Sequence, residues 1–251
     1  MLKKLSIILE GEGNISYNYH YPLMVNLYEA MELIDKDKAK WIHDKGVSID
    51  NKKIKLFNFC LDFNKNVDYN VNHVAIKGFN QIKLILSGDE KILNLIIKGL
   101  VKKGNITLGS CILYIVNIEE SKKVRYENVM LYKVRTPIIE SLYQDGTVYI
   151  NPYQQEWYRA IANNLKRKYK AVYNEEYADE IYFDIENILN IKKKYITNIK
   201  NKGYVIGYTD FEIFIEATPK MQKVIYNLGI GQNTSMGMGA VSYVKGWKEN
   251  E

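Results

Sequence analysis

The sequence contains few cysteines, few histidines and no long apolar run. Its 251 residues include two cysteines, Cys60 and Cys111, and three histidines. Both cysteines lie in apolar runs typical of strands, where a free thiol is usually buried, so we expect neither a disulfide framework nor a metal site. No apolar run reaches the length of a membrane span, and the apolar part of the N-terminus is too short for a signal peptide. We therefore expect a cytoplasmic protein with no membrane partner and no cofactor.

Charge and composition are those of an ordinary folded protein. A net charge of +6 permits a polyanionic partner without requiring one. Tyrosine is unusually frequent, at 21 residues, and lysines with tyrosines can contact the phosphates and stack on the bases of a single-stranded nucleic acid. An AT-rich coding bias also raises Lys, Ile, Asn and Tyr together, so the tyrosine content alone does not decide between these explanations.

Four glycines near the C-terminus form two Gly-x-Gly pairs. Residues 229–239 read Gly-Ile-Gly-Gln-Asn-Thr-Ser-Met-Gly-Met-Gly. Glycine adopts positive φ and lets another backbone approach closely, so this loop can offer unobstructed N–H groups to a phosphate backbone. A glycine-rich turn that only lets a strand pass close to a helix explains the spacing equally well.

Two familiar phosphate-binding loops are excluded. A Walker A loop ends in Gly-Lys-Ser or Gly-Lys-Thr, and the segment 229–239 contains no lysine. A dinucleotide-binding fingerprint needs a third glycine where Thr234 stands, followed by a complete βαβ unit.

Apolar periodicity in the first half predicts the order strand, helix, strand, strand, helix, strand. The four strands are expected at 3–10, 52–61, 79–87 and 104–119, and the two helices at 22–34 and 89–103. A second short helix should end at His43. Residues 62–78, which include His73, are expected to form a surface loop or an irregular hairpin. This order is typical of a ferredoxin-like domain.

The second half repeats the order with an insertion. Strands are expected at 128–134, 147–150, 181–189, 192–196, 203–217 and 239–245, and helices at 152–172 and 219–226. The first of these helices should carry Lys166, Arg167, Lys168 and Lys170 on its outer face. The fold class is therefore α+β, with two tandem ferredoxin-like (βαββαβ) domains at 1–123 and 124–251, each an antiparallel sheet with helices on one face.

Two groups of residues carry a resemblance to a known family. One is the complete glycine-rich segment 229–239, and the other is the order Tyr21-Pro-Leu, Tyr28, His43 and Lys55-Leu-Phe, with Arg135-Thr-Pro-Ile entering the second half. Together they resemble the CRISPR-associated repeat-RNA endoribonucleases of the Cas-six family, in the RAMP superfamily. The resemblance covers essentially the whole chain. Met238 departs from the family pattern, which often has an aromatic residue there.

The resemblance implies metal-independent cleavage of CRISPR repeat RNA in precursor transcripts. The ribose 2′-hydroxyl attacks the adjacent phosphate and leaves a 2′,3′-cyclic phosphate and a 5′-hydroxyl. Such a reaction needs one group to take the 2′ proton, one to protonate the leaving oxygen, and a cation to stabilise the phosphate. The resemblance places His43, Tyr28 and Lys55 in these roles, and it leaves open which of Tyr28 and His43 is the base.

Each of these residues also has a structural interpretation. His43 fits an exposed histidine at a helix end, and Tyr28 fits a core tyrosine on an amphipathic helix, with an ordinary pKa of ~10 that makes it a poor base. Lys55 has rivals in Lys52 and Lys53, and all three fit a solvated strand edge. The resemblance is what favours the catalytic interpretation of His43.

The RNA-binding candidates are the glycine-rich loop and residues expected close to it or to the catalytic residues. They are Gly229, Gly231, Gln232, Asn233, Thr234, Ser235, Gly237, Gly239, Lys220, Lys223, Lys52 and His20. RNA recognition should combine phosphate contacts with the reading of single-stranded bases or of a hairpin.

Two other functions are compatible with the sequence. The chain could be a non-catalytic RAMP-type subunit that binds CRISPR RNA in a surveillance complex, which would have no need of Tyr28, His43 and Lys55. A small-molecule enzyme on a ferredoxin-like scaffold is the weaker alternative, because the sequence offers no paired acids, metal ligands or nucleotide loop. Further CRISPR-associated subunits and a homodimer are partners that the sequence leaves open.

Overall fold

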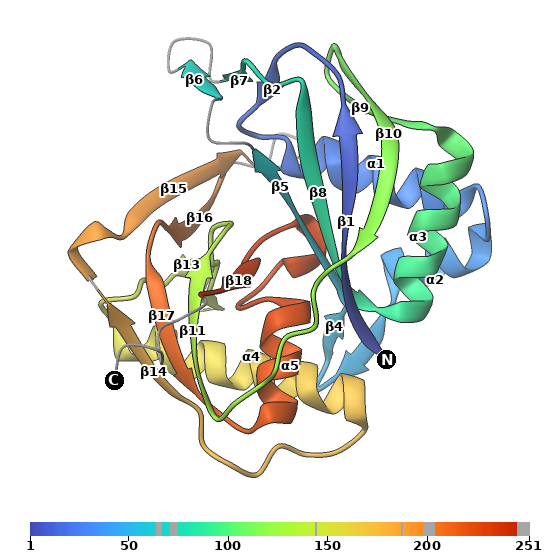
Figure 1. Cartoon of the computed structure of the whole chain (residues 1–251). Helices are drawn as coiled ribbons and strands as arrows, with labels where there is room; N and C mark the ends of the chain where they lie inside the picture. The colour runs from blue at the N-terminus through green and yellow to red at the C-terminus, as the bar shows by residue number, and fades with distance from the viewer. Residues whose placement is uncertain (64–66, 71–74, 144, 187, 198–203, 245–251) are drawn as a thin grey trace.

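The protein is built on two antiparallel sheets, each covered by helices on one face. The computed structural model describes residues 1–63, 67–70, 75–143, 145–186, 188–197 and 204–244. In Figure 1 the first half of the chain, from blue to green, forms one lobe, and the second half, from yellow to red, forms the other. The lobes lie side by side.

The first sheet has the strand order of a ferredoxin-like fold. Its strands lie in the order β5-β8-β1-β10, with β9 added beyond β10, and every neighbouring pair is antiparallel. The strands are β1 (Leu2–Glu10), β5 (Phe57–Phe63), β8 (Gln81–Asp89), β9 (Asn105–Leu108) and β10 (Cys111–Glu120). The helices are α1 (His20–Glu32), α2 (Lys36–Asp44) and α3 (Glu90–Lys103). The predicted element order is confirmed.

Two predicted strands of the first half are wrong in their extent. The segment 52–61 is divided between β4 (Lys52–Ile54), which pairs with β3 (Val47–Ile49), and β5, which belongs to the main sheet. The segment 104–119 is likewise a hairpin of β9 and β10, because Gly109 has φ 65° and turns the chain. Lys55 therefore lies between two strands and not inside one.

The predicted loop at 62–78 is confirmed as an irregular hairpin in its described part. It contains β6 (Asp68–Asn70) and β7 (Ala75–Lys77), and β7 also pairs with β2 (Ile15–Ser16). His73 lies outside the described residues.

The second sheet repeats the same topology. Its strands lie in the order β14-β17-β11-β18, all antiparallel. They are β11 (Val129–Val134), β14 (Tyr182–Glu186), β17 (Glu212–Glu216) and β18 (Val241–Tyr243), with helices α4 (Gln155–Tyr173) and α5 (Pro219–Leu228). Two additional hairpins are inserted, β12 (Ser141–Tyr143) with β13 (Thr147–Tyr149), and β15 (Lys192–Thr197) with β16 (Tyr204–Thr209). Short 3-10 turns lie at Ile188–Asn190 and Thr234–Met236.

Some element ends in the second half differ from the prediction. Pro152 does not open α4, which begins at Gln155, and the strand predicted to reach residue 189 ends at Glu186. The last strand covers 241–243 within the described residues, because Gly239 still belongs to the glycine-rich loop.

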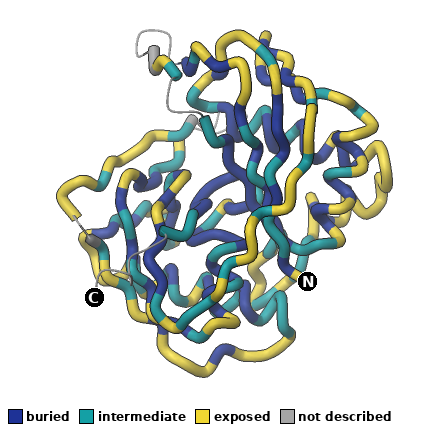
Figure 2. The backbone as a smooth tube through the Cα atoms, viewed as in Figure 1, coloured by how far each residue is buried: buried dark blue, intermediate teal, exposed yellow. Residues whose placement is uncertain are grey.

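Each half has its own hydrophobic core. The first core joins β1, β5 and β8 to α1 and α3, and the second joins β11 and β17 to α4 and α5. Figure 2 shows the buried backbone running through the centre of both sheets, whereas the helix surfaces and hairpins are exposed. Leu2, at the start of β1, packs into the second core, so the first strand contacts both halves.

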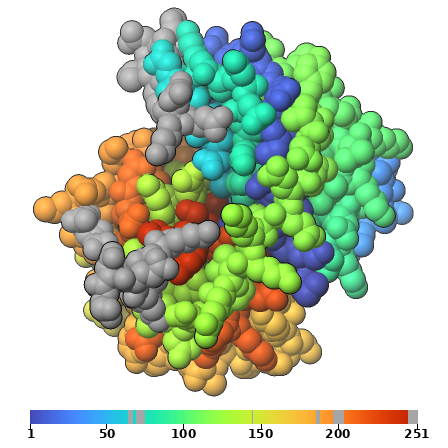
Figure 3. Space-filling view, in the orientation of Figure 1, coloured from blue at the N-terminus to red at the C-terminus, as the bar shows by residue number. Residues whose placement is uncertain are grey.

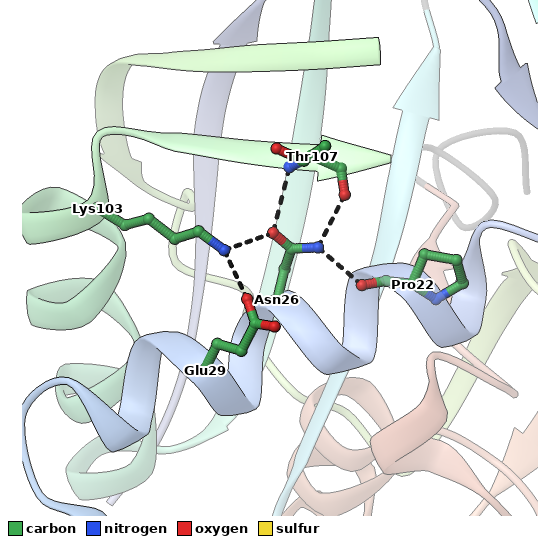
Figure 4. Close-up of polar contacts among 5 residues, drawn as sticks. All are labelled: Pro22, Asn26, Glu29, Lys103 and Thr107. Atoms are coloured by element: carbon green, nitrogen blue, oxygen red, sulfur yellow. Dashed lines mark hydrogen bonds and ion pairs between the residues drawn. The ribbon is translucent and has the colours of Figure 1, made fainter. Parts of the chain in front are cut away.

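Polar contacts hold α1 in a defined position. The Asn26 side-chain amide donates to the carbonyl groups of Pro22 (2.9 Å) and Thr107 (2.8 Å), and its oxygen accepts from the Thr107 N–H and from Lys103 Nζ (Figure 4). Lys103 also pairs with Glu29 at 2.8 Å. Because buried polar groups are costly unless they are paired, these bonds fix α1 against β9 and α3.

Polar contacts also join the two halves. Lys4 on β1 donates to the carbonyl groups of Tyr226 and Val241, at 3.1 and 2.9 Å. Arg135 forms an ion pair with Asp62. In the space-filling view the surface is hollowed between the two lobes (Figure 3).

Candidate active site

A cleft of about 380 Å³ brings together residues that are far apart in the sequence. Its walls come from α1, from the end of α2, from the β4–β5 connection, from α4 and from the glycine-rich loop. The lining residues are Tyr21, Met24, His43, Lys53, Ile54, Lys55, Asn164, Lys168 and residues 231–236. Both halves of the chain are therefore needed to form this cleft.

His43 is presented to solvent by the last turn of α2. The N-cap of this helix is Asp35, whose carboxylate accepts from the Lys38 N–H, and the His43 side chain is 56% exposed. Its Nδ1 lies 2.8 Å from Asp44 Oδ1, and this hydrogen bond holds the pKa of the Asp44 carboxyl below its usual value. With Nδ1–H donating to Asp44, Nε2 has no partner among the described residues, and its lone pair can accept a proton.

Tyr28 lies directly against His43. The two ring centroids are 5.0 Å apart at an interplanar angle of 84°, a favourable edge-to-face contact. Tyr28 is 7% exposed, and its hydroxyl has no hydrogen-bond partner among the described residues. Burial, and to a smaller extent the charge of Asp44, raise the pKa of Tyr28, so the phenol stays protonated at neutral pH.

Lys55 completes this group. Its Nζ lies 5.6 Å from the centroid of the Tyr28 ring, within the range of a cation–π contact. Partial burial lowers the pKa of Lys55. Gly46, which precedes β3, leaves room for the β3–β4 hairpin that brings Lys55 close, because a Cβ there would lie 2.6 Å from the Ile54 carbonyl oxygen.

The glycines of the loop are required by packing. Gly229, Gly231, Gly237 and Gly239 all have φ between 63° and 79°. A Cβ on Gly239 would lie 1.7 Å from the Ile230 oxygen, and one on Gly237 would lie 2.5 Å from the Phe59 ring. The Asn58 amide of β5 donates to the Met238 carbonyl at 3.1 Å. The loop thus passes close to a strand of the other half.

The part of the loop that lines the cleft consists mostly of residues 232–236, which lie between the two glycine pairs. All four glycines are buried, and among them Gly231 lines the cleft together with Gln232, Asn233, Thr234 and Ser235. The backbone hydrogen bonds within and beside the loop use the N–H groups of residues 229, 230, 232 and 236–239. Those of 233–235 have no partner among the described residues and can be offered to a ligand.

Lys168 is a residue of this site that sequence reasoning placed wrongly. It is 4% exposed, and its Nζ donates to the carbonyl groups of Gly229 and Gly231, both at 2.9 Å. Burial lowers its pKa to about 7. It lies three residues after Leu165, on the same inward stripe as Trp157 and Ile161, and this spacing could have identified it.

Glu140 also contacts this loop. It is 2% exposed, and its Oε2 accepts from Gln232 Nε2 at 2.9 Å. Burial raises its pKa to about 7, although Lys168 acts in the opposite direction. Ser141 adds a hydrogen bond from its Oγ to Gln232 Oε1 at 3.1 Å. Glu140 could not be identified from the sequence, because it lies outside any periodic segment.

The other predicted RNA-binding residues do not line this cleft. His20 is buried and stacks on Tyr19 at 4.3 Å, and burial lowers its pKa to about 4. It borders a second cleft of about 780 Å³ between the halves. Lys52 is exposed on β4, and Lys53 is the lysine of that strand that lines the first cleft.

Lys220 and Lys223 were expected to approach the glycine-rich loop. Lys220 lies in the first turn of α5, whereas the loop begins after the last turn. Its Nζ lies 3.4 Å from Glu175, away from the cleft. Neither lysine lines the cleft. For Lys220 the reason is its place at the far end of a ten-residue helix, whose two ends are ~15 Å apart.

Two structural findings concern ligands and membranes. Among the described residues, no three His, Cys, Asp or Glu side chains gather so that they could hold a metal ion. Within the same part of the chain, no helix is both long and apolar enough to cross a membrane.

Residues 119–243 match the family model described as CRISPR associated protein Cas6, C-terminal. The chain is 27% identical to CRISPR-associated endoribonuclease Cas6 1 of Methanocaldococcus jannaschii, over 92% of this chain and 88% of that protein. It is 23% identical to CRISPR-associated endoribonuclease Cas6 of Pyrococcus furiosus, over 90% and 83% of the two chains. A solved structure described as an RAMP protein binding different RNA substrates has a TM-score of 0.83 at 14% identity, covering 97% of this chain and 100% of that one.

Proposed function

Since the chain belongs to the Cas6 family of CRISPR-associated proteins, we propose that it is an endoribonuclease that cleaves CRISPR repeat RNA in precursor transcripts to produce guide RNAs. The observation that carries this proposal is the meeting of Tyr28, His43 and Lys55 beside the glycine-rich loop. The two curated relatives, named as endoribonucleases, support it over most of the chain length.

His43 is the general base in this proposal. Its Nδ1–H is held by Asp44, so Nε2 can take the proton of the ribose 2′-hydroxyl. The 2′-oxygen then forms a bond to phosphorus, the bond between phosphorus and the 5′-oxygen breaks, and the products are a 2′,3′-cyclic phosphate and a 5′-hydroxyl. The carboxylate of Asp44 stabilises the imidazolium that forms.

Lys55 stabilises the charge on the phosphate and supplies the proton to the leaving 5′-oxygen. Its lowered pKa makes the ammonium a better proton donor than an exposed lysine. Tyr28 remains protonated, so it is not the base; its ring supports His43 and Lys55, and its hydroxyl is buried behind them. The N–H groups of residues 233–235 bind the RNA backbone on the opposite wall.

The alternative is a subunit that holds CRISPR RNA without cutting it. The structural neighbour described as binding different RNA substrates favours RNA binding by this fold and does not distinguish the two functions. Repeat RNA labelled at its 5′ end is incubated with the wild type and with His43→Ala. The nuclease proposal expects cleavage by the wild type, and binding without cleavage by the variant. Tight binding with intact RNA in both samples would support the binding subunit.

We further propose the domain division at 123/124, between the end of β10 at Glu120 and the start of β11 at Val129. CRISPR repeat RNA, as precursor and as product, is the partner this function requires, and the cytoplasm is the compartment in which such transcripts are made. Association with further CRISPR-associated subunits or with a second copy of the chain is compatible with this role. Sedimentation with and without RNA measures the oligomeric state.

A further inference from the structure

Lys168 occupies an unusual position for a lysine. It lies on α4 in the wall of the cleft and is 4% exposed, yet its hydrogen-bond acceptors are two backbone carbonyl groups and not a carboxylate. Burying an ammonium group is costly unless its hydrogen bonds are satisfied. A methionine or leucine would fill the same space without this cost, so packing alone does not account for the lysine.

The two carbonyl groups belong to the loop that faces His43. Gly229 and Gly231 are the first Gly-x-Gly pair, directly before residues 232–235, which line the cleft. Because both carbonyl groups are bonded to Lys168 on α4, the peptide planes of this turn are fixed. The path of the residues that follow the turn is fixed with them. Both glycines have positive φ, a conformation that is readily lost without such a constraint.

Glu140 constrains the same loop through Gln232. Its carboxylate binds the Gln232 amide, and the Gln232 N–H donates to the Ile139 carbonyl at 2.8 Å. The loop is thus held both by a buried lysine on α4 and by a buried glutamate that follows β11. The attraction between the two opposite charges strengthens this arrangement.

We propose that Lys168 is a positioning residue for RNA binding: by holding the carbonyl groups of Gly229 and Gly231, it keeps residues 232–235 in the conformation that receives the RNA backbone. The proposal rests on the proposed function, because it names what orients that RNA-binding wall. Lys168 itself need not touch a phosphate, since its hydrogen bonds go to the loop.

The test compares Lys168→Met with Lys170→Met and Lys55→Met in the full chain. The probe is a repeat RNA with a 2′-deoxy nucleotide at the cut site, which can be bound and not cut. Lys170 lies on the same helix, pairs with Glu176 and does not line the cleft, so it controls for loss of one charge. Binding of this probe is measured at several salt concentrations. The rate of single-turnover cleavage is measured separately, with the all-ribose RNA and saturating protein.

Lys168→Met should raise the Kd on the order of 10- to 100-fold, as expected for a misplaced binding group. The saturated cleavage rate should fall by less than about 3-fold, because the His43 group is intact. In Lys168→Met, the slope of the logarithm of the association constant against the logarithm of the salt concentration should not change. In Lys55→Met, the magnitude of this slope should fall by about 0.7, the value for one phosphate contact on a single strand. Lys170→Met should bind as the wild type does.

Three results would overturn the proposal. The first is an unchanged Kd for folded Lys168→Met. The second is a salt slope reduced as much as in Lys55→Met, which would make Lys168 a direct phosphate ligand. The third applies if Lys168→Met does not fold, in which case Lys168→Arg is measured instead. The larger arginine head group keeps the charge but should displace the loop, so an affinity for RNA equal to that of the wild type would contradict the proposal. Failure of the wild type to bind repeat RNA would instead remove the proposed function itself.

Discussion

The ring of Tyr28 meets the ring of His43 edge to face, with the centroids 5.0 Å apart. Tyr28 comes from the middle of α1, which Asn26 fixes to the sheet hairpin, and His43 comes from the last turn of α2. A rigid helix therefore supports an exposed imidazole. This contact determines where Nε2 of His43 is presented to the cleft.

Replacing Tyr28 with phenylalanine should separate ring support from hydroxyl chemistry. The Tyr28 hydroxyl is buried without a partner, and removing such a group is neutral or stabilising. Because Tyr28→Phe keeps the ring against His43, we expect an unchanged or higher Tm and a cleavage rate within about 10-fold of the wild type. Tyr28→Ala should reduce both. A loss on the order of 1,000-fold in Tyr28→Phe, with normal binding, would show that the hydroxyl itself takes part in the reaction.

Lys55 is expected to protonate the leaving oxygen, and this role has a specific chemical test. Lys55→Ala should slow cleavage of ordinary RNA by about 100- to 10,000-fold, the usual contribution of a general acid or base. In an RNA with sulfur in place of the bridging 5′-oxygen, the leaving thiolate needs no proton. We expect that substrate to restore most of the rate to Lys55→Ala.

His43→Ala is the matched control for this experiment. Its defect lies in removing the 2′ proton, which the sulfur substitution does not replace. If the sulfur substrate restored cleavage to His43→Ala and not to Lys55→Ala, His43 would be the general acid and Lys55 the general base.

Much of the fold could be predicted because local patterns and packing agree. The inward stripe of α3, with Asp89 as its N-cap, is visible in the sequence and present in the structure. The β9–β10 hairpin was missed because a short turn inside a long apolar run does not interrupt the two-residue alternation that predicts a strand. The β3–β4 hairpin was missed because its strands have only three residues each, too few to show that alternation. Gly109 was the available signal for the β9–β10 hairpin.

The site was predictable to a smaller extent. His43 and Tyr28 were found through a resemblance, and their contact depends on how α2 returns against α1, which no local pattern specifies. Lys168 was assigned to the outer face because of its charge, although its spacing from Leu165 points inward. A buried lysine becomes understandable once its two carbonyl acceptors, more than 60 residues away, are known.

The glycine-rich loop should be intolerant of side chains for steric reasons. Gly239 and Gly109 have nearly the same φ, 63° and 65°. A Cβ on Gly239 would lie 1.7 Å from the Ile230 oxygen, whereas one on Gly109 would meet no atom within 4 Å. Gly109→Ala should cost about 1 kcal/mol from the left-handed conformation alone. Gly239→Ala should cost more than about 3 kcal/mol, measured by urea unfolding, and equal losses would mean that close packing does not explain the loop.

His20 should make stability depend on pH. Burial lowers its pKa from 6.5 to about 4 in the folded state, so between these values the unfolded chain binds a proton that the folded chain does not. Stability should therefore fall as the pH decreases from 6.5 to about 4, by about 1.4 kcal/mol per pH unit and about 3 kcal/mol in all. The difference between wild type and His20→Leu in urea unfolding isolates this contribution, and a difference that stays constant with pH would contradict it.

The central claim is cleavage by the ribose 2′-hydroxyl with His43 as the base. The most direct measurement follows labelled repeat RNA in excess EDTA, with and without a single 2′-deoxy nucleotide at the cut site, and identifies the product ends. We predict one cut by the wild type, a 2′,3′-cyclic phosphate and a 5′-hydroxyl at the ends, and no cut in the 2′-deoxy RNA or with His43→Ala. Cleavage of the 2′-deoxy RNA, or a 5′-phosphate on the product, would contradict the account.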